Sequence, residues 1–300
     1  MKNILVLFCT LLSFAPLAQA KLNVVATMTD FAAIAQEIGG DKVSVTSLAK
    51  GTEDPHFADA RPSFASLLHK ADLLLEGGAE LEIGWLTPVL NNARNAKILP
   101  GGANNLRMSS GVQLLEVPAG PIDRSMGDVH PLGNPHYYLD PANGAIMAEH
   151  ITEAFCRLDA TNAEFYRENF RRFKERLEKK MTEWKERLAP FRGTKVLTYH
   201  KSYEYFTERF GLEVTGQLQP KPGIEPSPTH INALIPLAKE QGVKLIVIEP
   251  YRPRQKADFV AKAIGAKLLV LPDRVGGNAE STDFFNRFDY LVDQIAKALK

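Results

Sequence analysis

A long charged helix is predicted in the middle of the chain, between two stretches in which strands and helices alternate. Residues 160–188 are rich in Glu, Lys and Arg, and their apolar side chains recur at the spacing of one helix face. These apolar side chains are Phe165, Phe170, Phe173, Leu177, Met181, Trp184 and Leu188. We expect Asp159 or Thr161 to cap the helix, and Pro190 and Gly193 to end it. At about 1.5 Å per residue it would span roughly 40 Å, enough to run the length of a two-lobed protein.

Short apolar runs precede and follow this helix, and each is followed by a stretch of helical spacing. The alternation predicts parallel strands with helices packed on them. The predicted strands are 22–27, 43–48, 72–76 and 97–99, then 195–199, 212–218, 243–248 and 267–271. The predicted helices are 31–38, 61–70, 81–93 and 145–158, then 203–210, 230–241, 255–264 and 283–299. Residues 101–134 lack a strong period and are predicted to be loop, with a short strand at 112–117.

The fold class is therefore predicted to be α/β, with two parallel-sheet lobes joined by one long spine helix. We expect an N-terminal lobe over residues 21–158, a linking helix over 159–190 and a C-terminal lobe over 191–300. Hydrophobic residues make up 45% of the chain, which is ample for two cores.

The first 20 residues have the pattern of a secretory signal peptide. A basic residue is followed by an apolar run over 4–18, too short to span a bilayer, and Ala18-Gln19-Ala20 matches a small-x-small cleavage site. Cys9 lies deep inside the apolar run, which does not favour a lipid anchor there. An uncleaved membrane anchor is the less favoured alternative. We expect a mature chain that begins at Lys21 and is soluble in a bacterial periplasm.

Charge and cysteine content exclude several classes of partner and site. The chain has 36 Lys and Arg against 35 Asp and Glu, so it lacks the basic excess that nucleic acid or an anionic membrane would demand. Removing the signal leaves only Cys156, which cannot form an internal disulfide or a cysteine-based metal site.

Three histidines lie in compact motifs that are far apart in the sequence. His56 ends the motif DPH, His136 lies in NPHYYLDP, and His200 lies in YHKSY. Their separations of 80 and 64 residues are far too long for a zinc finger, so only a complete fold could bring them together. His56 and His200 follow predicted strands and fall at the carboxyl edge of a sheet, where open α/β sheets bind ligands. We therefore predict a metal site between the two lobes.

A carboxylate completes the predicted ligand set. Asp273 follows the last predicted strand, and the alternative for it is a turn or capping role. Three imidazoles and one carboxylate are typical of zinc. His130, in the loop that leads into the His136 motif, is a weaker auxiliary candidate. The acids that could orient the ligating histidines are Glu249, Asp140 and Asp54.

These motifs, in this order, resemble the cluster A-I periplasmic solute-binding proteins of zinc and manganese ABC transporters, the ZnuA and TroA type. The segment PGIEPS at 222–227 and the spine helix extend the resemblance over essentially the whole mature sequence. It implies two α/β lobes joined by a rigid helix, and a metal ion in the interlobe cleft that is delivered to a membrane permease. The family's ligands fall on His56, His136, His200 and Asp273. A periplasmic metallochaperone is a further possible partner.

Zinc is the expected ion, and manganese is the alternative. Members of this family that select manganese or iron tend to have a glutamate at the position of His200, and imidazole nitrogen suits zinc better than manganese. The best-known zinc importers carry a long His-rich loop before the second histidine, whereas the loop here is short and holds only His130. Because histidine must be neutral to bind a metal, we expect the affinity to fall as the pH drops through about 6.

A secreted zinc hydrolase and a metal-binding adhesin or buffer are the alternatives to a carrier. A secreted zinc hydrolase would need an open coordination position and a base such as Glu249 or Glu225, but four ligands would close the shell. The motif H-E-x-x-H is also absent from the sequence. An adhesin or a periplasmic metal buffer stays open as an alternative. We therefore predict a protein that is not an enzyme and has no catalytic residues.

Overall fold

Two parallel four-stranded sheets form the framework of the protein. The computed structural model describes residues 20–121, 126–127 and 129–300, so the predicted signal peptide lies almost entirely outside the described residues. The first sheet has the order β2-β1-β3-β4 and the second the order β6-β5-β7-β8, with all neighbours parallel. The strands are β1 Leu22–Ala26, β2 Val43–Ser47, β3 Leu73–Glu76, β4 Asn105–Arg107, β5 Lys195–Thr198, β6 Glu213–Gln217, β7 Leu245–Ile248 and β8 Lys267–Val270. The predicted fold class is confirmed.

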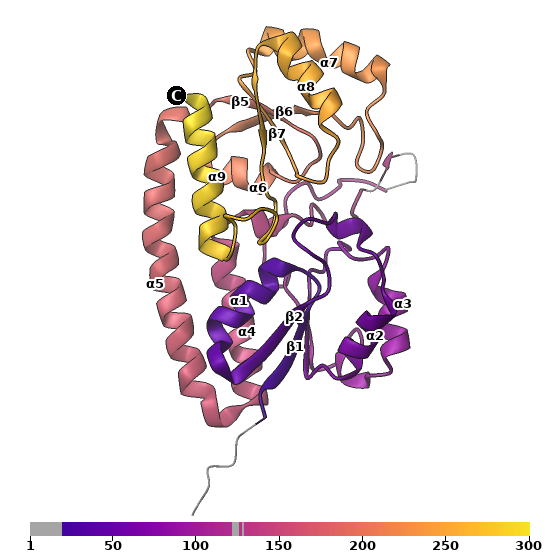
Figure 1. The fold of residues 1–300 in the computed structure, drawn as a ribbon, viewed down its shortest axis with the longest axis vertical. Coiled ribbons are helices and arrows are strands. Elements are labelled where there is room, and N and C mark those ends of the chain that lie inside the picture. Colours follow the sequence, from indigo (N-terminus) through magenta and orange to yellow (C-terminus); the bar gives the residue numbers. More distant parts are fainter. Residues whose placement is uncertain (1–19, 122–125, 128) are drawn as a thin grey trace, which may run out of the picture.

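Helices flank both sheets, and the longest runs along the side of the whole molecule (Figure 1). The helices are α1 Thr29–Gly39, α2 Pro62–His69, α3 Leu86–Ala93, α4 Asn143–Leu158, α5 Ala163–Leu188, α6 Glu204–Phe210, α7 Pro228–Gln241, α8 Arg254–Ile264 and α9 Phe284–Leu299. The long helix, α5, has 26 residues and lies beside α9 and α4. It is extended at each end by a 3₁₀ turn, Ala160–Asn162 and Ala189–Phe191.

Two predicted strands are wrong, and so is one predicted cap. The fourth strand of the first sheet is Asn105–Arg107, whereas Ala96–Ile98 form a 3₁₀ turn. The side chain of Asn95 accepts a hydrogen bond from the Lys97 amide there, and such a side-chain cap favours a helical turn over a strand. Residues 112–117 form no strand. The carboxylate of Asp159 accepts from the Tyr166 hydroxyl instead of capping α5.

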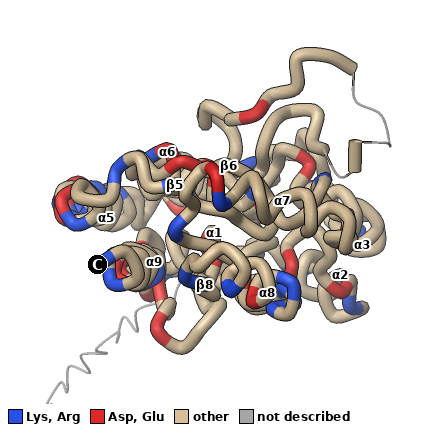
Figure 2. Tube along the Cα trace, turned by 90° about the horizontal axis from the view of Figure 1, so that it is seen from above, with Lys and Arg blue, Asp and Glu red and all other residues tan. Residues whose placement is uncertain are grey.

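The charged face of α5 is solvated, as its sequence pattern indicates. Arg171 forms ion pairs with Glu168 and Glu175, one turn away on either side. Figure 2 shows acidic and basic residues interspersed on this helix. Exposed pairs of this kind contribute only about 0.2–1 kcal/mol each, so the buried face of α5 holds it in place.

One apolar core connects the two sheets through α5 and α9. Its buried members include Val24 in the first sheet, Val196 and Val247 in the second, Phe31 in α1 and Phe288 in α9. Smaller clusters lie under α2 and α3 and under α7 and α8. Because the central core draws on both sheets, we expect the two lobes to unfold together.

Close packing of α9 depends on a glycine in α4. A Cβ atom placed on Gly144 would lie 2.4 Å from the ring of Phe284, so only glycine allows this contact. The ring of Phe288 in turn lies 5.4 Å from that of Trp184 in α5. The indole N–H of Trp184 donates to Asp289 over 2.7 Å.

Among the described residues, no helix is both long enough and apolar enough to cross a membrane.

Replacing Phe288 by alanine should lower the free energy of unfolding by about 3–5 kcal/mol, because it opens a cavity in the core that both sheets share. Urea unfolding followed by circular dichroism and by tryptophan fluorescence measures it. Trp85 lies in the core under α2 and α3 and Trp184 in the central core, so tryptophan fluorescence reports on both cores. Because the central core draws on both sheets, we expect a single shared transition. The matched control is Phe259→Ala on α8, where the side chain is 56% exposed, with an expected change within about 0.5 kcal/mol. Two separate transitions would contradict a shared core.

Candidate metal centre

Three histidines from distant parts of the chain meet between the two sheets. One ring nitrogen from each of His56, His136 and His200 can be chosen so that the three lie within 4.8 Å of one another. The Nε2 atoms of His56 and His136 are 3.2 Å apart. The three ring centroids are 5.1–5.5 Å apart. His136 and His200 are buried, and His56 is half-buried.

The same local turn holds the first two histidines. In DPH, the Asp54 side chain accepts a hydrogen bond from the backbone N–H of His56 over 3.0 Å. In NPH, the Asn134 side chain accepts from the backbone N–H of His136 over 2.9 Å. An Asx side chain that bonds two residues ahead, around a proline of fixed φ, gives a rigid turn. Each turn therefore fixes the backbone from which its imidazole projects.

Hydrogen bonds fix the orientation of two of the rings. The Nδ1 atom of His200 lies 2.8 Å from Oε1 of Gln219, which can only accept, so Nδ1 carries the proton and Nε2 keeps its lone pair. The Nδ1 atom of His136 lies 2.9 Å from the Tyr138 hydroxyl. Tyr138 is two residues from its histidine and could have been found in the motif. Gln219 is 19 residues away, just after the end of β6, and no local pattern in the sequence points to it.

The acids predicted to orient the histidines have other partners. Glu249 accepts from the Ser202 hydroxyl, and Asp140 accepts two hydrogen bonds from Arg209. Asp54 caps its own turn and lies 3.0 Å from Arg252. None of these three carboxylates is hydrogen-bonded to an imidazole among the described residues.

Side chains from both halves of the chain join across the site. The amide of Asn134 donates to the backbone carbonyl of Lys201, next to His200, over 2.8 Å. The Tyr205 hydroxyl donates to the Asn134 carbonyl over 2.6 Å. The ion pair between Asp54 and Arg252 likewise connects the two halves. These contacts hold the histidines of the first half against His200.

Burial keeps the imidazoles neutral. It lowers the pKa of His56 and of His136 well below the ordinary 6.5, and neighbouring imidazoles and the Arg252 guanidinium add to the effect. Burial, with a further contribution from Arg252, lowers the pKa of His200 to about 3. Neutral imidazoles are the form that binds metal, so the site presents nitrogen lone pairs at neutral pH.

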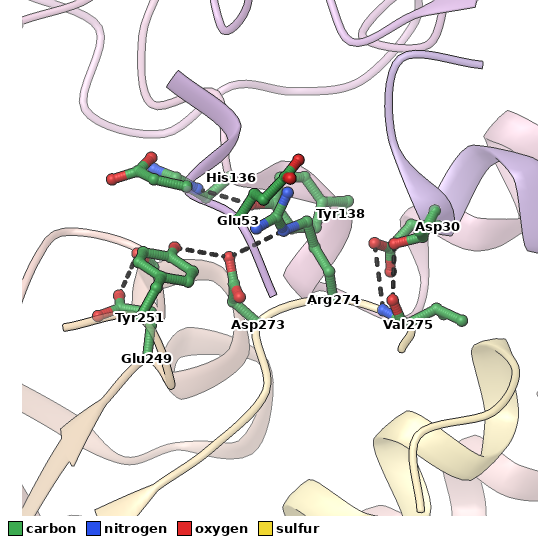
Figure 3. Close-up of polar contacts among 12 residues, drawn as sticks. Asp30, Glu53, His136, Tyr138, Glu249, Tyr251, Asp273, Arg274 and Val275 are labelled. Carbon is green, nitrogen blue, oxygen red and sulfur yellow. Dashed lines mark hydrogen bonds and ion pairs between the residues drawn. The ribbon is translucent and has the colours of Figure 1, made fainter. Parts of the chain in front are cut away.

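Asp273 lies outside the three-histidine cluster, but one of its carboxylate oxygens has no hydrogen-bond partner among the described residues. Its carboxylate is fully buried, and Oδ2 accepts from the Tyr251 hydroxyl over 2.9 Å (Figure 3). Within the described part of the chain, Oδ1 has no hydrogen-bond partner. A buried carboxylate oxygen without a donor is costly, and a metal ion would satisfy it.

His130 lies against the cluster without joining it. Its ring stacks on that of His56, with centroids 5.1 Å apart and planes 23° from parallel. Together with His136 and His200 it lines a pocket of about 90 Å³.

Comparisons with known proteins give a consistent result. The family model described as periplasmic zinc-uptake complex component A matches residues 24–298. The chain is 25% identical over 313 residues to the manganese ABC transporter substrate-binding lipoprotein PsaA of Streptococcus anginosus, covering 99% of this chain and 98% of that protein. It is also 25% identical over 317 residues to a metal ABC transporter substrate-binding lipoprotein of Lactococcus lactis, with 99% and 98% coverage.

Solved structures share the fold. A crystal structure of ZnuA has a TM-score of 0.77 at 24% identity, covering 93% of this chain and all of that one. A manganese-bound periplasmic metal binding protein from Candidatus Liberibacter asiaticus has a TM-score of 0.76 at 24% identity, with 93% and 100% coverage.

In the metal-free protein, the NMR chemical shifts of the imidazole nitrogens of His56, His136 and His200 should stay at the values of neutral imidazole down to about pH 5. Burial lowers each pKa, whereas a histidine of pKa 6.5 would be about 97% protonated at that pH. Long-range ¹H–¹⁵N spectra measure this, with single histidine variants for assignment. A titration midpoint near 6.5 for any of the three would show that its ring is solvated.

Proposed function

We propose, from the premise that the chain belongs to the family of the periplasmic zinc-uptake complex component A, that it captures Zn²⁺ between its two lobes and delivers the ion to a membrane permease. Members of this family are solute-binding proteins of metal ABC transporters and not enzymes. The role of substrate-binding protein for a metal ABC transporter agrees with the family resemblance of the sequence motifs. The identity of the ion and of its ligands is the proposal.

The observation that carries the proposal is the convergence of three histidine nitrogens within 4.8 Å. Two nitrogens bound to one tetrahedral zinc at about 2.0–2.1 Å would be roughly 3.3 Å apart. The Nε2 atoms of His56 and His136 are 3.2 Å apart, close to that spacing without a metal. We assign His56, His136 and His200 as ligands and Asp273 as the fourth, through its unpartnered Oδ1.

Manganese is the alternative cargo. The relative from Streptococcus anginosus is named a manganese transporter protein, and the structure from Candidatus Liberibacter asiaticus holds manganese. The ligand chemistry favours zinc, because manganese prefers oxygen-rich sites and is the weaker binder at nitrogen donors.

Capture and release would proceed without covalent chemistry. The mature chain would consist of lobes at 21–158 and 191–300 that are joined by the helix at 159–190. It would be secreted to the periplasm through a cleaved signal peptide. The core shared through α5 and α9 restricts lobe movement to a small tilt or to movement of the loops that carry the histidines. Docking on the permease would separate the two halves of the site and release the ion.

Elemental analysis tests the proposal after the mature protein is equilibrated with equal zinc and manganese. We expect one zinc per chain in the wild type and a sharp loss in His200→Ala. The matched control is His69→Ala, since that ring lies against the Ala93 carbonyl, away from the cluster. Preferential manganese would retain the carrier role and overturn zinc, and the absence of stoichiometric metal would overturn the metal site.

Zinc affinity should change less than about threefold between pH 7 and 5.5. The sequence alone predicts a loss near pH 6, but the pKa of each of the three imidazoles is lowered, so its neutral form persists to lower pH. Three solvated histidines of pKa 6.5 would together weaken binding roughly 600-fold over that range. Competition with a chelator of known pH dependence measures the dissociation constant, and a loss of more than about 30-fold would contradict a preformed neutral site.

A further inference from the structure

Four fully buried charged side chains, one of them the proposed ligand Asp273, form a cluster. Asp30 comes from α1, Asp273 and Arg274 follow β8, and Arg287 comes from α9. Arg287 lies 3.2 Å from Asp30, and Arg274 lies 3.3 Å from Oδ2 of Asp273. Figure 3 shows Asp273 between Tyr251 and Arg274, with Asp30 farther along toward Val275. Two positive and two negative charges balance in this cluster.

The two arginines differ in how they are satisfied. Arg287 donates to the backbone carbonyls of Asp273 and Tyr138 over 2.8 and 3.0 Å. Arg274 donates no hydrogen bond from any guanidinium nitrogen to a described residue. A buried guanidinium that makes no hydrogen bond is costly, since water is removed and no acceptor replaces it. The carboxylate of Asp273 is its nearest counter-ion, and the charge of Asp30 also stabilises it.

The same guanidinium acts on the histidine site. Burial is the main cause of the lowered pKa of His56, and the Arg274 charge adds a smaller contribution after those of two imidazoles and Arg252. Burial and the Asp273 charge raise the pKa of Tyr138, whose hydroxyl is hydrogen-bonded to His136, and the Arg274 charge opposes that rise. A cation held by the histidines and by Oδ1 of Asp273 would share that carboxylate with Arg274 and would be repelled by it.

We propose that Arg274 is an internal competitor for Asp273, whose positive charge weakens metal binding and speeds release. The inference rests on the proposed metal site and deepens it. In the empty site the guanidinium neutralises the charge of Asp273. In the loaded site the ion would bind Oδ1 while the guanidinium stays paired with Oδ2. Arg274 therefore sets the affinity without being a ligand.

Replacing Arg274 by glutamine should tighten zinc binding at least tenfold, through slower release of zinc to a chelator in stopped-flow measurements. Arg274→Lys keeps the charge and should stay within about threefold of the wild type. The metal-free glutamine variant should melt lower, because Asp273 loses its counter-ion, and its melting temperature should rise more with zinc than that of the wild type. A merely structural or orienting role for Arg274 predicts the opposite, namely weaker binding and a smaller rise. Weaker or unchanged binding in a folded Arg274→Gln protein would overturn the proposal.

Asp30→Asn provides a second test if the glutamine variant does not fold. The amide oxygen can still accept from the Val275 N–H, a bond of 3.4 Å in the wild type, but the charge that offsets the arginines is gone. The proposal expects zinc binding to weaken at least threefold, although Asp30 contacts none of the proposed ligand side chains. The matched control is Asp258→Asn, an exposed acid on α8. Unchanged or tighter binding in Asp30→Asn would overturn the proposal.

Failure of this inference is distinguishable from failure of the proposed function. If the wild type takes up no stoichiometric zinc or manganese, the metal site itself is wrong. If the wild type binds metal and Arg274→Gln does not bind it more tightly, only the role of Arg274 is wrong.

Discussion

The packing of α9 against α5 is the contact on which the rest of the molecule depends. The chain leaves the second sheet after β8, passes through Asp273 and Arg274, and forms α9. This last helix packs along α5 and contributes to the core that the two sheets share. Phe284 and Phe288 fill that core, and Gly144 leaves room for the first of them. The segment carrying the proposed fourth ligand is thereby anchored on both lobes, so the distance between the sheets is set by close-packed side chains.

Much of this fold could be predicted from the sequence because its signals are local. Buried parallel strands give short apolar runs, and α5 gives a clear 3.6-residue period over 26 residues. The errors came where a short polar segment decides the structure. Asn105–Arg107 is a strand with polar ends at a sheet edge, and its apolar signal is a single leucine. The Asn95 cap turned the more apolar Ala96–Ile98 into a helical turn instead.

The candidate site was predictable in part for the same reason. The Asx-Pro-His turns are local, so His56 and His136 stood out as rigidly held side chains. The groups that orient and join the histidines depend on contacts between distant elements. Gln219, just after β6, contacts His200, just after β5, and Asn134 contacts the backbone next to His200. No spacing in one sequence encodes such pairs. The acids near the histidine motifs were predicted to hydrogen-bond the imidazoles, but the neutral side chains of Gln219 and Tyr138 do so instead.

The two halves of the chain contribute differently to the proposed site, since the first provides two histidines and the second provides His200 and Asp273. His56 and His136 belong to the first half, where two stiff turns keep their Nε2 atoms 3.2 Å apart. His200 belongs to the second half and is joined to the first by bonds through Asn134 and Arg252. In the proposed site, the second half would act as a tethered set of ligands whose effective concentration depends on how closely the halves approach. A partner that widened the gap by a small distance would therefore lower the affinity steeply while leaving the histidine pair of the first half intact.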